Sequence, residues 1–196
     1  MTAFITLCWR RRIERIALLL LGLLWLAVAQ AGSIVPKKAE LVPDERGYAV
    51  NAEFAIQIGP RLEDAVSKGV PLHFRFEIQI KRKRWYWIDE HVAGRVLKYR
   101  LGYQALTRQY RLTFGSLHQN YDSLEEALHA LGHVVRLHVV EKTDLPQGDP
   151  LLVAVRLSLD HDQLPKPLQI DALADRDWQV EANTLSWQFS LPTESP

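Results

Sequence analysis

Cysteine is almost absent from this sequence, in which Cys8 is the only example. Because Cys8 precedes an apolar run near the N-terminus, the rest of the chain can form neither a disulfide nor a cysteine-ligated metal or iron–sulfur site. The lack of a cysteine after that run also excludes a lipoprotein signal. We therefore expect packing alone to stabilise the folded part.

Motifs for nucleotide binding and for nucleophilic catalysis are also missing. The chain has no glycine-rich phosphate loop. Ser116 and His118 lie close together in sequence, but no Gly-x-Ser-x-Gly turn and no cysteine nucleophile accompany them. The sequence therefore predicts no cofactor, and it favours a protein without enzymatic activity.

Two groups of potential metal ligands carry only weak signals. His129 and His133 have the spacing of two ligands on one helix, but a zinc protease would need Glu in place of Ala130. Gly132 is also expected to end the helix before His133. Asp160–Asp162 would alternate sides along an extended segment and so would not converge on one ion. We interpret both groups as solvated surface residues and predict no metal site.

Charge is unevenly distributed along the chain, although the formal net charge is only +1. Residues 73–111 contain ten Lys and Arg against three Asp and Glu, whereas residues 112–196 contain five against thirteen. The favoured interpretation is that these two segments pair within the fold. The alternative is a basic face that attracts a phosphorylated glycan, a lipid headgroup or an acidic protein surface.

The first 31 residues have the pattern of an export signal. Arg10–Arg12 and Arg15 precede the uncharged run Ile16–Ala29, and small residues follow at positions suited to a signal peptidase. The alternative is an uncleaved anchor over residues 16–35, since about 20 apolar residues can span a bilayer. Either way, we expect export by the general secretory route to the periplasm, with the arginines left in the cytoplasm.

Strand patterns dominate the remainder. Leu72–Lys81 alternates apolar and polar residues, and Val96–Tyr103 and Thr107–Phe114 repeat this period of two, which indicates an antiparallel meander. Residues 32–43 are expected to form a linker running into a first edge strand, and residues 116–121 a polar connection.

Two short helices interrupt the strands. Pro60 suits the first turn of one helix over Arg61–Lys68, and Ser123 with Glu126 forms a capping box for a second helix that ends at Gly132. We therefore predict an all-β fold for residues 44–196. It should be a single two-layer, mainly antiparallel sandwich of eight or nine strands with two short helices, preceded by the N-terminal export helix.

One hairpin is the best candidate for a binding site. It combines four cationic residues with three aromatic ones: Lys81, Arg82, Lys83 and Arg84, then Trp85, Tyr86 and Trp87. Aromatic faces beside cations can stack on sugar rings and contact phosphates. The favoured alternative is structural, with the aromatic rings in the core and the charges keeping the hairpin soluble.

The chain resembles the DUF4390 family of exported proteins from Gram-negative bacteria, whose function is unknown. The resemblance rests on three stretches and two tryptophans: residues 83–90, 103–110 and 164–168, Trp178 and Trp187. It implies an exported domain that faces the periplasm, and its association with genes beside a sensor histidine kinase suggests a membrane sensor as a partner. It implies no catalytic residues.

Taken together, these patterns predict a non-enzymatic periplasmic protein-interaction module. Its expected partner is an envelope protein, with a membrane sensor kinase as one candidate and with the inner membrane as a further contact if the N-terminal segment stays uncleaved. The alternative is a carbohydrate-binding or lipid-headgroup-binding domain that uses the Lys81–Trp87 hairpin. Nucleic acid is not expected, because export removes the domain from the cytoplasm.

Overall fold

The computed structural model describes residues 32–84, 89–146, 150–166, 168–169, 178, 180 and 182–191. The chain divides into two compact units, Met1–Gln30 and Ala31–Pro196, and every described residue belongs to the second. The expected export segment lies outside the described residues. Within the described part, no helix is long and apolar enough to cross a membrane.

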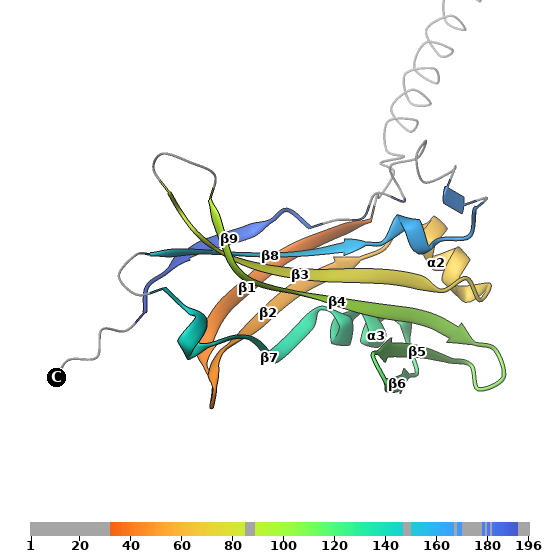
Figure 1. Cartoon of the computed structure of the whole chain (residues 1–196). Coiled ribbons are helices and arrows are strands. Elements are labelled where there is room, and N and C mark those ends of the chain that lie inside the picture. The colour runs from red at the N-terminus through yellow and green to blue at the C-terminus, as the bar shows by residue number, and fades with distance from the viewer. Residues whose placement is uncertain are drawn as a thin grey trace, which may run out of the picture. The chain divides into compact units, whose positions relative to one another are not determined.

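The described part of the second unit holds nine strands in two antiparallel sheets (Figure 1). The smaller sheet has the order β1 (Ser33–Pro43), β2 (Gly47–Gln57) and β7 (His133–Glu141). The larger sheet has the order β6 (Leu117–Tyr121), β5 (Gln109–Phe114), β4 (Glu90–Gln104), β3 (Leu72–Arg82), β8 (Leu151–Leu159) and β9 (Leu185–Phe189). The predicted antiparallel β architecture is confirmed.

Side chains from both sheets meet in one apolar core. The rings of Phe54 in β2 and Phe76 in β3 pack edge to face across the two layers, with their centroids 6.0 Å apart. Every second residue of β3, from Leu72 to Ile80, is buried, as its alternating sequence predicts. Burying one such large apolar side chain contributes about 1.5 to 3 kcal/mol, so strand faces supply most of the stability.

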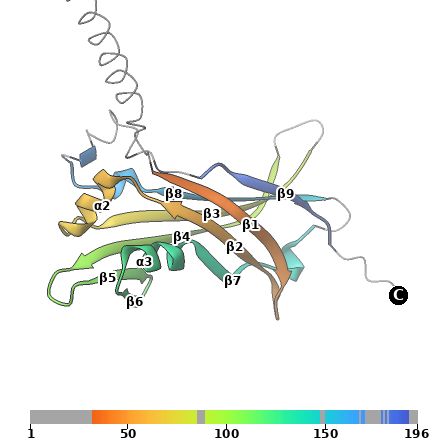
Figure 2. The same cartoon turned by 180° about the vertical axis from the view of Figure 1, so that it is seen from behind.

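Two short α-helices cover parts of the sheets. The first, α2 (Pro60–Ser67), begins with proline in its first turn and is followed by Gly69 at φ 90°. The second, α3 (Leu124–Leu131), packs against β2, β5 and β6 (Figure 2). Ser123 Oγ accepts a hydrogen bond from the backbone N–H of Glu126 at 3.1 Å, which confirms the predicted N-cap.

Two segments that were expected to connect other elements form strands instead, and the edge strand expected to follow the first of them is present in β1. The expected linker is part of β1, which begins at Ser33 and tolerates two prolines because it is an edge strand with an irregularity between Pro36 and Lys38. Residues 117–121 are not a connection but strand β6. Gly115 at φ 55° lets the chain reverse in two residues, so that Phe114 lies opposite Leu117.

Candidate functional site

The positive charge of the predicted hairpin site, Lys81–Trp87, is partly neutralised by a nearby glutamate, Glu90. Arg82 Nε and Arg84 Nη2 donate hydrogen bonds to the same oxygen, Oε2 of Glu90, at 2.8 and 2.7 Å. The hydrogen bonds from these two guanidinium groups hold the pKa of Glu90 below its usual value, and Arg82 has the larger effect. Trp85, Tyr86 and Trp87 lie outside the described residues. Two of the four hairpin cations therefore already have an anionic partner.

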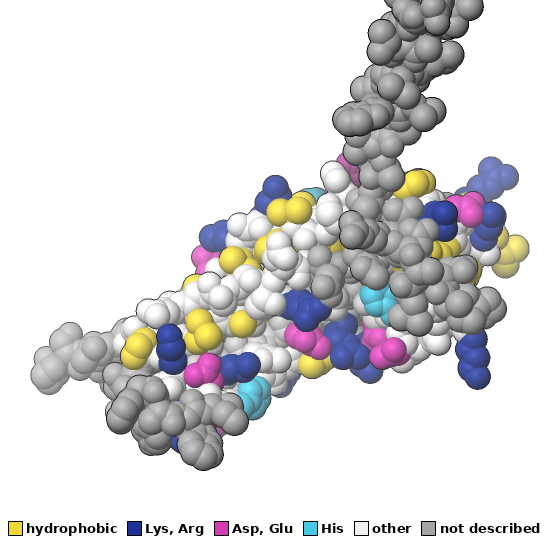
Figure 3. Space-filling view, turned by 90° about the horizontal axis from the view of Figure 1, so that it is seen from above, with side chains coloured by type: hydrophobic (Ala, Val, Ile, Leu, Met, Phe, Trp, Pro, Cys, Tyr) yellow, Lys and Arg dark blue, Asp and Glu magenta, His cyan; other side chains and the backbone are white. Residues whose placement is uncertain are grey.

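One ion pair between the basic and the acidic segment joins Arg75 to the buried Asp160. Arg75 Nη2 lies 3.2 Å from Oδ2 of Asp160, which is 7% exposed. Two other ion pairs do not join these segments: Arg82 pairs with Glu90 within residues 73–111, and Arg136 pairs with Asp44 in the β1–β2 turn. On the face seen from above, basic and acidic side chains lie next to one another near the middle (Figure 3).

The histidine pair at the end of α3, His129 and His133, has the arrangement expected for surface residues. Gly132 caps the helix, and His133 begins β7. The ring of His133 stacks on that of His129 with centroids 4.2 Å apart, and its Nδ1 lies 2.7 Å from the carbonyl oxygen of His129. Among the described residues, no group of three or more His, Cys, Asp or Glu side chains could hold a metal ion.

The expectation of a solvated loop at Asp160–Asp162 needs correction. Asp160 is buried and paired with Arg75, and its N–H donates to the carbonyl oxygen of His73 at 2.7 Å. Residues His161–Gln163 form a short 3-10 helix, η2, in which His161 Nε2 lies 2.6 Å from the carbonyl oxygen of Trp178. Two of the three side chains therefore hold the fold together.

A long open strand edge is the most distinctive surface feature of the described residues. Strand β4 has fifteen residues, but β5 has only six and pairs with Tyr99–Gln104 alone. Among the described strands, the stretch Glu90–Lys98 therefore has a neighbour, β3, on one side only. Such an edge carries backbone N–H and C=O groups that can pair with another extended chain.

The open edge of β4 borders a groove of about 340 Å³. Strand β7 forms the other wall and is itself the edge of the smaller sheet. The groove is lined by residues from the β1–β2 turn, from β4, from β7 and from the 3-10 helix η1 (Lys142–Asp144): Arg46, Val92–Ala93, Arg95, His138–Glu141 and Asp144. Two unpaired strand edges thus face a common space.

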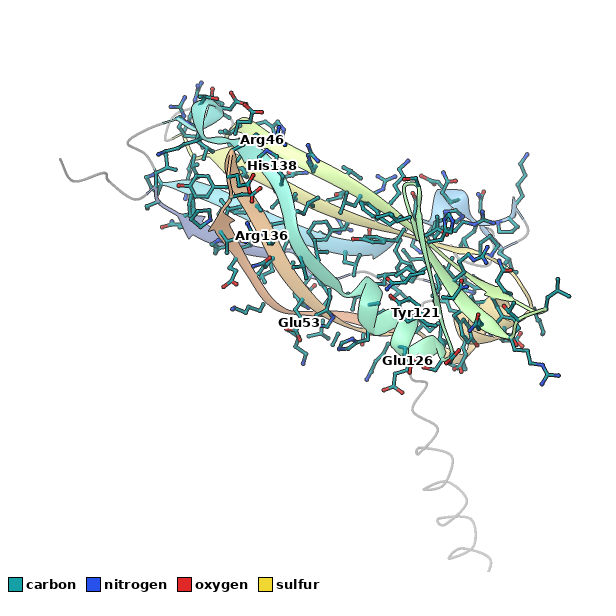
Figure 4. All side chains as sticks on the ribbon, turned by 90° about the horizontal axis from the view of Figure 1, so that it is seen from below. Arg46, Glu53, Tyr121, Glu126, Arg136 and His138 are labelled. Atoms are coloured by element: carbon teal, nitrogen blue, oxygen red, sulfur yellow. The ribbon has the colours of Figure 1, made fainter. Side chains whose placement is uncertain are left out.

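Charges in the groove are mixed. Arg46, Arg95 and His138 supply cationic or titratable nitrogen atoms, whereas Glu141 and Asp144 supply carboxylates at the end of β7. Arg46 and His138 lie near one another at this end of the molecule (Figure 4). A docked segment would therefore meet both signs of charge, which favours a peptide with charged side chains over a purely apolar ligand.

A charged cluster fixes the wall formed by β7. Asp44 accepts a hydrogen bond from Arg136 Nη2 at 2.8 Å, and its other oxygen lies 3.4 Å from His138 Nδ1. The bond from Arg136, followed by that from the backbone N–H of Glu45, holds the pKa of Asp44 below its usual value. Arg136 itself has φ 48°, and its N–H donates to Oδ1 of Asn51. The groove wall is thus held by side-chain contacts as well as by the strand ladder.

The groove could not have been assembled from sequence patterns. Its charged residues come from three distant segments, and Arg95 lies just before the stretch Val96–Tyr103 in which the sequence indicated a strand. Because β4 begins at Glu90, it is longer at its start than that pattern predicts. The one sign of an open edge was a difference in length, because β4 is long and β5, which follows it, is short.

Comparison with known proteins identifies the family of the chain. No curated protein and no solved structure matches the chain. A family model described as a domain of unknown function, DUF4390, matches residues 31–188, which include the groove and all of both sheets except the last residue of β9. The chain therefore belongs to the DUF4390 family.

Proposed function

We propose that this chain is a non-enzymatic periplasmic protein-interaction module, which takes an extended segment of an envelope protein into the groove between β4 and β7. The observation that carries the proposal is the unpaired edge of Glu90–Lys98 beside a groove. An extended segment can add to such an edge as a further strand. Backbone hydrogen bonds then give affinity, and side chains on the groove walls give selectivity.

The side chains on this edge support a selective partner. Strand edges that carry charges resist indiscriminate pairing, and His91, Arg95 and Lys98 give the edge that character. A basic segment would be repelled by Arg95, whereas a partner segment with an acidic residue opposite Arg95 would be attracted. Complementary charge of this kind raises the rate and the specificity of association.

The cellular part of the proposal rests on the sequence. The basic N-terminus and the apolar run support export by the general secretory route, with the sandwich in the periplasm. If the segment around residues 16–35 is not cleaved, it holds the module at the inner membrane. A membrane sensor kinase, the partner suggested by the family resemblance, is one candidate.

The carbohydrate or lipid-headgroup alternative has less support. It requires free cations beside the aromatic residues of the hairpin, but Arg82 and Arg84 share Glu90. Binding at the groove does not require Arg82 and Arg84 to leave Glu90. We therefore assign the interaction to the groove.

Charge reversal in the groove tests the proposal. The tagged full chain is cross-linked in cells, purified from the membrane fraction, and compared with Arg95→Glu and with the control Arg108→Glu, which lies on the exposed β4–β5 turn. We expect an envelope protein that is enriched with the unaltered chain and the control, and lost with Arg95→Glu. The same set of proteins with all three chains would contradict the proposal. Equal melting temperatures of the two variants would exclude unfolding as the cause.

A further inference from the structure

A row of polar side chains crosses four strands on the outer face of the larger sheet. His73 in β3 lies opposite Arg100 in β4, Arg100 lies opposite Thr113 in β5, and Thr113 lies opposite His118 in β6. Neighbouring strands are about 4.8 Å apart, so adjacent side chains of this basic row can reach one ligand group. Leu72, Phe74 and Leu101, beside His73 and Arg100 along their strands, are buried, which places the row on the opposite, outer side.

Two further cations flank the basic row. Lys98 and Arg111 lie two positions before Arg100 and Thr113 on the same faces of their strands, and Arg111 Nε donates to Oδ1 of Asn120 at 3.0 Å. Among the described residues, neither Lys98 nor Arg100 lies in an ion pair with a carboxylate. The nearby Asp160 is engaged by Arg75. Within the part of the chain that the structure describes, the positive charge of Lys98 and Arg100 is therefore not paired with a carboxylate.

The imidazole of His73 lies close enough to this positive charge for its pKa to respond. Its partial burial and the nearby Arg100 lower its pKa from 6.5, Lys98 lowers it further, and Asp160 opposes them. The pKa of His73 is lowered overall, because burial, Arg100 and Lys98 together outweigh Asp160. Repulsion among these groups is a cost that a bound anion would remove.

We propose that the basic row binds the phosphate group of a phosphomonoester or phosphodiester. Arg100 can donate two parallel hydrogen bonds to phosphate oxygens, and Thr113, His73 and His118 can donate from either side. The flanking Lys98 and Arg111 add longer-range attraction. The site lies on the outer face of the larger sheet, so the inference is independent of the protein-binding groove.

The His73 imidazole provides the readout. A bound phosphate would offset Arg100 and Lys98 while leaving the Arg75–Asp160 pair in place, and so would raise the pKa of His73. The Cε1–H resonance of His73 is followed by NMR in the full chain while inorganic phosphate is added. A parallel titration with chloride at equal ionic strength measures simple screening.

We expect phosphate to raise the pKa of His73 more than chloride does. Arg100→Met should weaken phosphate binding about tenfold or more, because a hydrogen bond to a charged group contributes on that order. Arg100→Lys should restore part of the affinity, and Arg108→Met should leave it unchanged. Equal effects of phosphate and chloride, or unaltered affinity in Arg100→Met, would overturn the inference.

A second arm distinguishes the sources of phosphate. The full chain is reconstituted in vesicles of phosphatidylglycerol or of phosphatidylcholine, and the His73 resonance is compared. A raised His73 pKa in phosphatidylglycerol alone would identify a lipid headgroup as the ligand. A response to inorganic phosphate with equal His73 pKa values in both vesicles would identify a soluble phosphorylated ligand. If Arg100→Met fails to fold, Arg100→Lys carries the comparison.

Discussion

Arg75 and Asp160 show how one residue pair can join distant parts of this fold. Arg75 lies in the middle of the larger sheet and Asp160 follows β8, and they lie 3.2 Å apart, with 37% of the arginine and 5% of the aspartate side chain exposed. Hydrogen bonding to Asp160 raises the pKa of Arg75. Sequence patterns placed Asp160 in a solvated loop because they cannot reveal which cation lies opposite it in space.

Removing Arg75 should therefore destabilise the protein. Arg75→Met leaves a buried carboxylate without its cation, and such a loss costs about 1 to 3 kcal/mol. Chemical denaturation monitored by circular dichroism measures the change in the free energy of unfolding.

A double variant separates the pair from other effects of the substitution. Arg75→Met with Asp160→Leu removes both charges, so its free energy of unfolding should recover relative to Arg75→Met alone. A double variant whose loss equals the sum of the two single losses would show that the pair is not coupled.

His73 gives stability a definite dependence on pH. Its folded pKa lies below 6.5, the value for the unfolded chain, so the unfolded state binds protons more readily as the pH falls through 6.5. The contribution of His73 to stability is therefore present above this pH and lost below it.

The prediction is tested with His73→Gln. The free energy of unfolding should fall less in this variant than in the unaltered chain between about pH 8 and about pH 5.5. Identical losses over this interval would mean that burial, Arg100 and Lys98 do not lower the pKa of His73 in the folded chain.

Among the elements, β4 differs most between its two halves. Tyr99–Gln104 lies between two strands, whereas Glu90–Lys98 pairs with β3 alone among the strands that the structure describes. In a strand paired on one side, only alternate N–H groups are hydrogen-bonded. Amide hydrogen exchange should therefore alternate between slow and fast along Glu90–Lys98 and be slow throughout most of Tyr99–Gln104. Uniform protection of the first stretch would indicate that another segment already covers the edge.

Helix α3 depends on its N-cap. Ser123→Ala removes the acceptor for the N–H of Glu126 and should lower the free energy of unfolding by about 1 kcal/mol. Ser67→Ala in α2 is a matched control, because its exposed hydroxyl donates only to the carbonyl oxygen of Asp64. The control should change stability by less than about 0.5 kcal/mol. Equal losses in thermal melts would contradict the capping role.

Strand alternation explains why most elements could be predicted. In β3 and β8 an apolar residue stands at every second position, and each residue of this series is buried. Strand β6 has the sequence Leu117–Tyr121 with four exposed residues, so no apolar period marks it. Its pairing depends on the Gly115 turn and on β5, which a local pattern does not contain.

At the scale of the whole molecule, the separated charges should make stability depend on salt. Lys98, Arg100 and Arg111 share the outer face of the larger sheet, and screening acts over about 8 Å at physiological ionic strength. We therefore expect the melting temperature to rise from low to moderate sodium chloride, contrary to the internal pairing favoured from sequence. A steady fall would show that pairs such as Arg75–Asp160 outweigh the repulsion.

The location of candidate sites was less predictable than the architecture. The Lys81–Trp87 hairpin stood out because its charges and rings are consecutive, yet Glu90 engages two of its arginines. The groove brings Arg46, Arg95 and His138 together from separate elements. Such a site depends on how the two sheets stack and on where their edges stop, and neither is encoded in a short motif.

The central claim is that the edge of Glu90–Lys98 receives a partner segment. The most direct test places a photo-cross-linking amino acid at position 95, in the groove, and in a second variant at Leu106, which is fully exposed on the β4–β5 turn. After irradiation of cells that express the full chain, we predict a discrete cross-linked adduct from position 95 and none from position 106. No adduct from position 95, or the same adduct from both positions, would contradict the account.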